Sequence, residues 1–197
     1  GGMDLSPNEV EQYSNLMSES QYMVAADTLN SINIPPTCRF LDVGGGKGTF
    51  VGELSKTYPK VDAAVFDLPG SHSENAEHTC IIGSFKEDEL PKGYDVISLV
   101  RILYDHRDKT IEILLDKVHR ALGSGGRLIV SEPMLGPDRP SIWGDVYFAI
   151  YTLAMRTGKT RSPNQVSDFI KAAGFVDIKI HKSRRPFITT VIEARKS

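Results

Sequence analysis

Two spacings of apolar residues divide this chain of 197 residues into helices and strands. Short runs dense in Val, Ile, Leu and Phe predict strands, and longer stretches with apolar residues three or four positions apart predict amphipathic helices. Strands are expected at 40–43, 61–66, 79–82, 94–100, 127–133, 176–181 and 187–194. Helices are expected within 6–33 (two) and over 47–57, 108–122, 142–156 and 162–173.

Most of these strands alternate with helices, which predicts a parallel sheet with helices on both faces. The run Tyr94–Val100 is nearly continuous in apolar residues, as expected for a strand that is covered on both faces. The last two strands follow each other around Arg184, Arg185 and Pro186 and can form an antiparallel hairpin. The predicted fold class is α/β: a Rossmann-like, mainly parallel, seven-stranded, doubly wound sheet with a C-terminal antiparallel hairpin.

A glycine turn follows the first predicted strand. Asp42 precedes Gly44, Gly45 and Gly46, and Gly48 comes after one further residue. Glycine allows positive φ and lets a ligand lie directly on the backbone, and the next helix offers free N–H groups to an anion. The spacing approaches the dinucleotide pattern G-x-G-x-x-G, but the last glycine comes one residue early. A tight turn without a ligand is the alternative.

The loops after the next strands hold further candidates, because parallel strands bring their carboxyl ends to one crevice. Asp67 ends the second strand, where a carboxylate can accept hydrogen bonds from both hydroxyls of a ribose. Its alternative is a turn aspartate before Leu68 and Pro69. Ser84 and Phe85 follow the third strand and can hydrogen-bond and stack on an adenine, although Phe85 can equally be a core residue.

Polar residues gather between Arg101 and Asp108, directly after the buried fourth strand. Tyr104 or His106 can contact the hydroxyl of an acceptor molecule, while a solvated side chain is the alternative for His106. Asp108 is expected to cap the following helix. Glu132 ends the fifth strand and can hydrogen-bond a base or a substrate, with a salt bridge at the rim as its alternative.

An aromatic stripe lies in the predicted helix after the fifth strand. Tyr147, Tyr151 and Met155 recur at helical spacing, which is typical of an ordinary helix core. As an insertion after the fifth strand, this helix would overhang the crevice, and its stripe would form an apolar wall of a substrate pocket.

The composition argues against several classes of protein. A formal charge of −2 and a pI near 6.2 give no basic field for nucleic acid. No apolar run approaches the roughly 20 residues of a membrane span and no signal peptide opens the chain, so a cytoplasmic protein is expected. Cys38 and Cys80 lack metal spacing and are expected to be reduced thiols, and no metal site is predicted.

Several segments together resemble the S-adenosylmethionine (SAM)-dependent O-methyltransferases of the plant, fungal and bacterial small-molecule type. Asp42 with the glycine turn resembles the motif L-D-V-G-G-G-x-G, and residues 66–69 resemble F-D-L-P. Residues 158–162 resemble G-K-E-R-T, and Ala-Gly-Phe follows at 173–175 as in the family. Tyr13 and Met17 are similar to the F-N-x-x-M-S helix that lies over the cofactor.

This resemblance implies a class I methyltransferase fold and SAM as cofactor, with S-adenosylhomocysteine as product. It implies methyl transfer to a hydroxyl of an apolar small molecule, and it places Tyr13, Met17, Leu68 and Arg101 on the cofactor with the turn residues. Residues 100–106 and 144–148 are similar to the bacterial branch that modifies carotenoids and bacteriochlorophylls.

The sequence departs from the family at the catalytic positions. Tyr104 stands where the family has the general-base His, His106 stands at its Trp, and Thr160 replaces an assisting Glu. Ser84 replaces an Asp near adenine, and Glu132 matches the other assisting Glu. A general base contributes about 10²–10⁴-fold to a reaction rate, whereas alignment of the reacting atoms lowers the barrier by roughly 7–11 kcal/mol. We therefore expect methyl transfer to survive the replacement of the family's His. With ordinary pKa values of about 10 for Tyr and 6.5 for His, Tyr104 is expected to hydrogen-bond the acceptor and His106 to accept its proton, directly or through water.

The resemblance also bears on domain organisation. We interpret Gly1-Gly2 ahead of Met3 as a cloning remnant, residues 4–36 as helices capping the cofactor site, and residues 37–197 as the SAM-binding catalytic domain. Family members carry an upstream helical dimerisation domain that this sequence lacks, so an excised domain is expected, with a natural short form as the alternative. A homodimer is expected only where that domain is present. Two other functions stay open. One is a SAM-binding module without activity; the other is an NAD-dependent oxidoreductase, against which the early glycine and the hairpin count.

Overall fold

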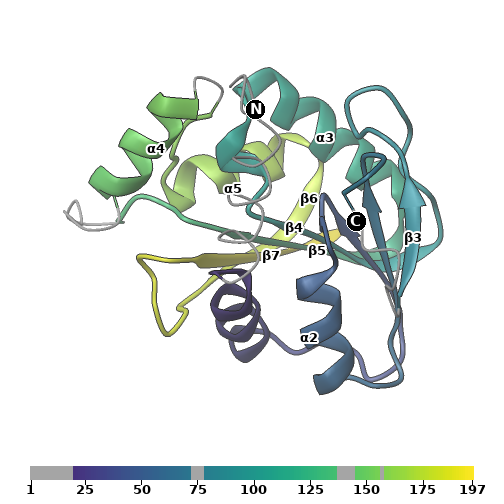
Figure 1. Cartoon of the computed structure of the whole chain (residues 1–197). Helices are drawn as coiled ribbons and strands as arrows, with labels where there is room; N and C mark the ends of the chain where they lie inside the picture. The colour runs from purple at the N-terminus through teal and green to yellow at the C-terminus, as the bar shows by residue number, and fades with distance from the viewer. Residues whose placement is uncertain (1–19, 72–77, 137–144, 156–157) are drawn as a thin grey trace.

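A seven-stranded sheet runs through the residues that this computed structural model describes, which are 20–71, 78–136, 145–155 and 158–197 (Figure 1). The strands are β1 (Arg39–Val43), β2 (Asp62–Asp67), β3 (Thr79–Ile82), β4 (Tyr94–Val100), β5 (Leu122–Glu132), β6 (Phe175–His181) and β7 (Thr190–Lys196). Their order is β3-β2-β1-β4-β5-β7-β6. The first five pair in parallel, whereas β7 runs antiparallel to both β5 and β6. The predicted fold class, including the closing hairpin, is confirmed.

Helices cover both faces of this sheet (Figure 1). The elements are α2 (Thr49–Thr57), α3 (Asp108–Ala121), α4 (Tyr147–Met155) and α5 (Pro163–Ala172), with a helix over residues 20–31 and a short 3₁₀ turn, η1 (Leu103–Asp105). The helices α3 and α5 lie on one face, and α2 and the helix over 20–31 lie on the other (Figure 1). Ser162 caps α5 in a reciprocal capping box with Gln165, and Pro163 occupies the first helical position.

Alternate strand residues feed two apolar clusters, as the pleat of a sheet requires. Leu41 and Val43 of β1 face α3 and α5, whereas Phe40 packs with Phe50 and Leu54 of α2. All five of these side chains are fully buried. The central strand β1 is therefore covered by helices on both faces, and near it the loops at the strand ends present polar groups to a ligand.

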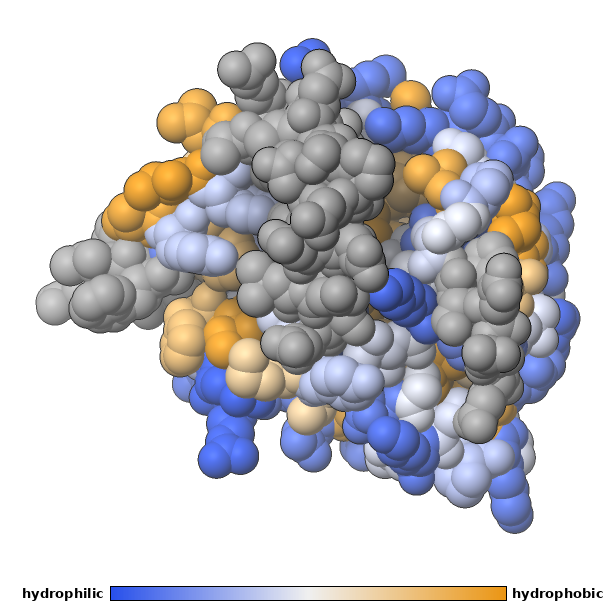
Figure 2. Space-filling model, viewed as in Figure 1, coloured by the Kyte–Doolittle hydropathy of each residue, from blue (hydrophilic) through white to orange (hydrophobic). Residues whose placement is uncertain are grey.

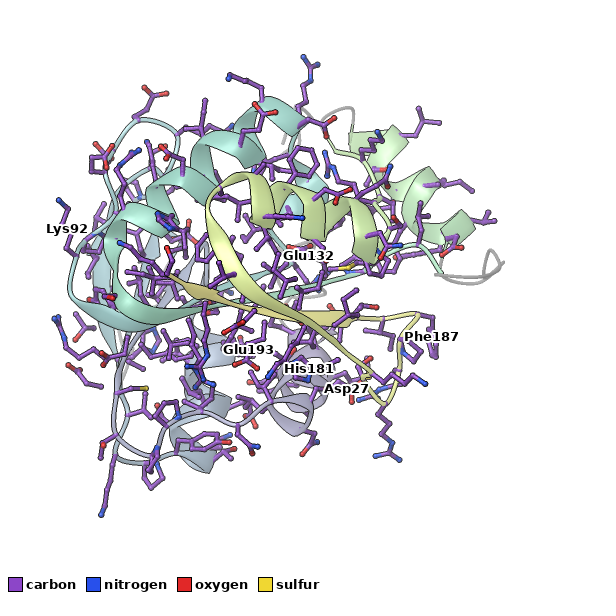
Figure 3. All side chains as sticks on the ribbon, turned by 180° about the vertical axis from the view of Figure 1, so that it is seen from behind. Asp27, Lys92, Glu132, His181, Phe187 and Glu193 are labelled. Carbon is purple, nitrogen blue, oxygen red and sulfur yellow. The ribbon has the colours of Figure 1, made fainter. Side chains whose placement is uncertain are left out.

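The helix over residues 20–31 is tied to the sheet by polar groups that are buried. Ser131 Oγ on β5 lies 2.6 Å from Thr28 Oγ1 and 2.7 Å from Thr189 Oγ1. Asp27, labelled in Figure 3, accepts hydrogen bonds of 2.8 and 3.0 Å from the guanidinium of Arg185. These contacts join the helix to the end of β5 and to the loop before β7.

Two predicted strand boundaries are wrong. β5 begins at Leu122 rather than at 127, because Leu122 is extended directly after α3 and pairs with Tyr94. β7 begins at Thr190 rather than at 187, because the N–H groups of Ile188 and Thr189 bond to the carbonyl of Arg185 and close a turn there. Of the two helices predicted within 6–33, the part up to residue 19 lies outside the described residues.

The buried hydroxyl chain generates a stability prediction. Ser131→Ala leaves Thr189 Oγ1 buried without its partner, so we expect the free energy of unfolding to fall by about 1–3 kcal/mol. Ser124→Ala, at an exposed position of the glycine-rich start of β5, is the matched control and is expected to change it by less than about 0.5 kcal/mol. Urea unfolding measures both. Equal values for the two variants would contradict a role for the hydroxyl chain.

Candidate active site

The glycine turn has the backbone conformation that its sequence predicts. Gly44, Gly46 and Gly48 have φ of 74°, 56° and 78°, a left-handed region that side chains rarely adopt. Gly45 is required for a different reason, because a Cβ on it would lie 2.5 Å from Asp42 Oδ2. The turn therefore presents bare backbone at the carboxyl end of β1.

Asp42 lies in the interior beside this turn. Its Oδ1 accepts a hydrogen bond of 2.5 Å from Ser98 Oγ on β4, and its Oδ2 has no hydrogen-bond partner among the described residues. Burial raises the pKa of Asp42 to about 7, and the bond from Ser98 opposes this. Oδ2 is thus a buried acceptor next to Gly45, which is itself partly buried.

Asp67 joins the ends of β1 and β2. Its Oδ2 accepts a bond of 2.7 Å from the N–H of Gly46, and its Oδ1 accepts one of 2.6 Å from the N–H of Leu68. The Leu68 side chain is exposed. The structure therefore brings Asp67 to the glycine turn, and each carboxylate oxygen keeps a further lone pair. The role of both residues toward a ligand stays a prediction.

The loop after β3 meets the loop after β4. The rings of Phe85 and His106 contact edge to face with centroids 5.2 Å apart. The Ser84 hydroxyl accepts a bond from the N–H of Lys86 in a local turn. Burial lowers the pKa of His106 to about 4, and the charges of Lys86 and Arg161 add to this. His106 is therefore neutral at pH 7.

Tyr104 turns away from this pair and toward α4. Its side chain is 2% exposed, stacks on Tyr151 at 5.6 Å and meets the edge of Phe148 at 6.1 Å. Burial raises the pKa of Tyr104, and its hydroxyl makes no hydrogen bond of normal geometry to a described residue, although Tyr151 lies close enough to influence the pKa. The structure thus separates Tyr104 from His106, which the sequence placed together.

The helix α4 continues these aromatic contacts outward. Tyr147 is 62% exposed and touches Phe148 with centroids 5.0 Å apart. Exposed apolar side chains gather on α4 (Figure 2): Val146, Tyr147, Ile150 and Leu153. Met155 ends the helix, but its side chain lies outside the described residues, as do Tyr13 and Met17. We call the rings of Tyr104, Phe148, Tyr151 and Tyr147 the aromatic wall.

Arg101 occupies the end of β4 in a strained conformation. Its φ is 59°, which is uncommon for a residue other than glycine and occurs most often at functional sites. Its N–H bonds to the carbonyl of Ser131, and its Nη1 donates to Ser20 Oγ at 2.8 Å. Arg101 therefore links β4 to the helix over residues 20–31 at the crevice.

Glu132, labelled in Figure 3, is buried and bonds to the turn that carries Tyr104. Its Oε1 accepts bonds of 2.7 Å from the N–H groups of both Ile102 and Leu103. Burial raises the pKa of Glu132 to about 8, and these backbone bonds oppose the rise. The alternative for Glu132, a salt bridge at the rim, is wrong because the side chain is buried, and its expected bond to a base or a substrate stays a prediction. Its contacts are those of a group that holds the turn.

Sequence reasoning missed two cations that order these loops. The Lys117 ammonium is buried and donates to the carbonyls of Phe85 and Lys86. Arg161 donates to the carbonyls of Leu103 in η1 and of His106 directly after it. The expected cap of α3 is also wrong. Asp108 is the first helical residue, makes no cap bond, and pairs with Arg161. The Lys-Thr-Arg-Ser segment was the available signal for Arg161.

Within the described residues, no group of three or more His, Cys, Asp and Glu side chains is placed to hold a metal ion. In the same part of the chain, no helix has the length and apolar character needed to cross a membrane. Cys38 and Cys80 are free thiols and half-buried.

Comparison with known proteins gives consistent matches. The profile of the O-methyltransferase domain family matches residues 3–176. The chain is similar to demethylspheroidene O-methyltransferase of Rhodobacter capsulatus, with 47% identity over 94% of this chain and 48% of the relative. It is also similar to the enzyme of the same name from Cereibacter sphaeroides, with 40% identity over 95% of this chain and 52% of the relative. The chain thus spans about half the length of these relatives.

Comparison with solved structures agrees with these family matches. Human N-acetylserotonin methyltransferase in complex with SAM superposes with a TM-score of 0.87 at 26% identity, covering 98% of this chain and 57% of that one. Mitomycin 7-O-methyltransferase superposes with a TM-score of 0.88 at 18% identity, covering 98% of this chain and 58% of that one, and this second match bears on the fold alone.

The raised pKa of Glu132 predicts a pH dependence of stability. Between its ordinary pKa of 4.5 and about 8, the folded state keeps a proton that the unfolded state has released, so stability falls as pH rises through this window. Glu132→Gln keeps the acceptor oxygen but does not titrate. Melting temperatures between about pH 6.5 and 8.5 should therefore fall less steeply for Glu132→Gln than for the wild type. Glu112→Gln, an exposed carboxyl on α3, is the control, and an identical slope in all three proteins would overturn this account.

Proposed function

This chain belongs to the O-methyltransferase domain family, and we propose that it transfers a methyl group from SAM to a hydroxyl of an apolar, carotenoid-like small molecule. One observation carries the proposal. The glycine turn with Asp42 and Asp67 opens at the same sheet edge as the aromatic wall that begins at Tyr104. This adjacency supports a donor site next to an apolar acceptor site.

The residues at the glycine turn fit SAM. Asp42 Oδ2 is a buried acceptor without a hydrogen-bond partner among the described residues, suited to the ammonium of the methionine part, and the backbone is open at Gly46, where a Cβ would meet nothing within 4 Å. Asp67 has lone pairs for the ribose hydroxyls, and the ring of Phe85 offers a flat surface to adenine. Bound SAM supplies an electrophilic methyl group on a positively charged sulfur.

The aromatic wall supports an elongated apolar acceptor with a hydroxyl at one end. Its rings run from buried Tyr104 to exposed Tyr147, and Tyr104 Oη is the polar atom at its inner end. Since burial raises the pKa of Tyr104, the phenol stays protonated and orients the acceptor rather than removing its proton. Holding oxygen and methyl carbon in line then provides the larger part of the acceleration.

His106 has less support as proton acceptor. Its ring is neutral, but a pKa of about 4 makes it a weaker base than free imidazole, and it packs against Phe85 rather than against the aromatic wall. In this proposal, His106 reaches the acceptor proton through water. A base of this kind is worth about 10²-fold, near the lower end of the usual range.

A SAM-binding module without activity is the second candidate function. It is favoured by Thr160, which replaces an assisting Glu and whose buried hydroxyl has no hydrogen-bond partner among the described residues. Under that reading the chain binds SAM but methylates no hydroxylated polyene.

Calorimetric titration with SAM, S-adenosylhomocysteine and NADH tests cofactor identity. We expect the first two to bind and NADH not to bind. Gly45→Ala should weaken SAM binding about 10-fold or more, because the added carbon crowds Asp42 at a cost of roughly 1–3 kcal/mol. Gly52→Ala on α2, where a Cβ meets nothing within 4 Å, is the control and should bind SAM normally. Binding of NADH in place of SAM would refute the proposal.

Turnover of a hydroxylated polyene tests the acceptor site. Tyr104→Phe removes the hydroxyl but keeps the ring, so kcat should fall about 10–100-fold with unchanged affinity for SAM. His106→Ala should lower kcat about 10²-fold. If His106→Ala turned over at the wild-type rate while Tyr104→Phe was inactive, His106 would have no part in proton transfer.

A further inference from the structure

We propose that Arg161 is a positioning residue for methyl transfer: it fixes the backbone of η1, and thereby holds Tyr104 against the acceptor. This inference rests on the proposed function and extends it to a residue outside the crevice. Arg161 precedes α5, whereas η1 follows β4, and the side chain bridges the two segments with only 3% exposure.

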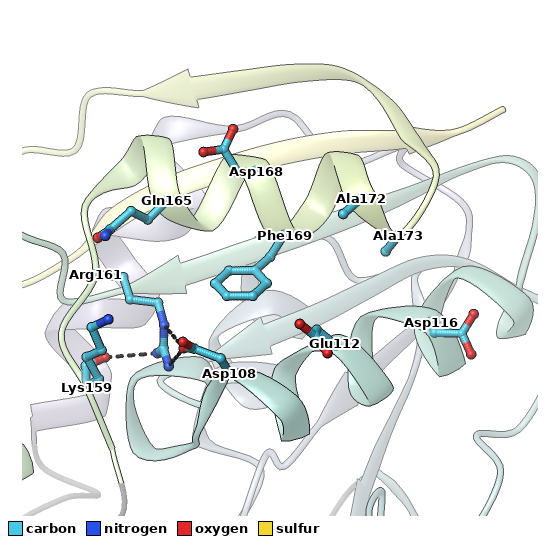
Figure 4. A pocket seen from close by; sticks show the side chains of 10 residues that line it. All are labelled: Asp108, Glu112, Asp116, Lys159, Arg161, Gln165, Asp168, Phe169, Ala172 and Ala173. Carbon is cyan, nitrogen blue, oxygen red and sulfur yellow. Dashed lines mark hydrogen bonds and ion pairs between the residues drawn. The ribbon is translucent and has the colours of Figure 1, made fainter.

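The guanidinium of Arg161 bonds to both ends of the turn, and Figure 4 shows its further bonds to Lys159 and Asp108. Its Nη1 donates to the carbonyl of Leu103 at 3.0 Å, and its Nη2 donates to the carbonyl of His106 at 2.9 Å. Its Nε and Nη2 also donate to Asp108 Oδ1, at 3.0 and 2.5 Å. The remaining N–H of Nη1 bonds to the carbonyl of Lys159 at 2.9 Å.

All five N–H groups of this guanidinium are therefore used within the protein. No donor is left for a substrate or cofactor, so Arg161 acts through the turn and not on the reacting atoms. The planar fork reaches two carbonyls of one turn and a carboxylate at once, which a lysine ammonium cannot reproduce.

The other backbone groups of the turn are held from the opposite side. Glu132 accepts the N–H groups of Ile102 and Leu103, and the N–H of Lys159 donates to the carbonyl of Tyr104 at 2.9 Å. Gly158 makes this approach possible, since a Cβ there would lie 2.0 Å from the Tyr104 carbonyl oxygen. Arg161 bonds to backbone carbonyls on both sides of Tyr104, at Leu103 and His106. The position of the Tyr104 ring therefore depends on Arg161.

The ion pair between Arg161 and Asp108 is accessible to solvent from one side. A groove of about 640 Å³ between α3 and α5 is lined by Asp108, Arg161 and Phe169, among others (Figure 4). Asp108 is half exposed on this groove, while Arg161 is buried behind it. Asp108 thus neutralises the buried cation from the solvent side, and removing its charge should loosen the turn less than replacing Arg161.

Hydrogen–deuterium exchange with mass spectrometry tests the inference, combined with SAM calorimetry and turnover of a hydroxylated polyene. In Arg161→Lys, exchange of peptides covering 101–107 should rise about 10-fold, while peptides covering β1 and α2 exchange as in the wild type. Turnover should fall about 10²-fold at unchanged SAM affinity, because misplacing a positioning group lowers kcat rather than cofactor binding. Asp108→Asn should show the same changes at smaller size.

Arg120→Met is the matched control, since Arg120 on α3 makes exposed ion pairs with Glu89 and Asp116 and should change none of these readouts. Wild-type exchange at 101–107 in Arg161→Lys, or faster exchange with undiminished kcat, would overturn the inference. A loss of protection across all peptides would also overturn it, by showing a role in global stability. Failure of the wild type to bind SAM would refute the proposed function separately, because exchange at 101–107 is measured without any ligand.

Discussion

Glu132 brings a carboxyl group into the interior, and the N–H groups of Ile102 and Leu103 are its partners there. Neither side of this contact is stable alone. A buried carboxyl without donors is costly, and so are buried N–H groups without an acceptor. Because each satisfies the other, the chain can leave β4 in a tight turn next to the crevice. The location of Tyr104 depends on that turn, and the aromatic wall begins at Tyr104.

The two halves of the site are built by different means. At the glycine turn, backbone groups form the surface, and neighbouring parallel strands bring Asp67 onto Gly46. At the aromatic wall, side chains of α4 and η1 form the surface, and their positions depend on the hydrogen bonds around η1. In the proposed function, the surface of nearly fixed backbone would take the methyl donor, and the surface that depends on long-range contacts would take the acceptor.

The sequence predicted the arrangement at the glycine turn better than that around Tyr104. Asp42, the glycines and Asp67 lie together as expected, because the adjacent parallel strands β1 and β2 end side by side, and their role toward a ligand stays a prediction. Tyr104 and His106 are two residues apart and were both assigned to the acceptor hydroxyl. The 3₁₀ turn η1, which contains Tyr104 and ends just before His106, directs the Tyr104 ring to α4 and the His106 ring to Phe85. Asp108 was read as a cap because Asp commonly caps helices, and Arg161, 53 residues away, bonds its carboxylate instead.

The sequence by itself determined the fold class, the alternation of helices and strands and the glycine turn, because periodicity and backbone freedom are local properties of the residues. Only the tertiary structure decided the raised pKa of Glu132, the five hydrogen bonds of Arg161 and the separation of Tyr104 from His106. The physical reason is distance along the chain. Glu132 and Arg161 reach Leu103 across 29 and 58 residues, so their burial and partners exist only once β4, β5 and α5 have packed together.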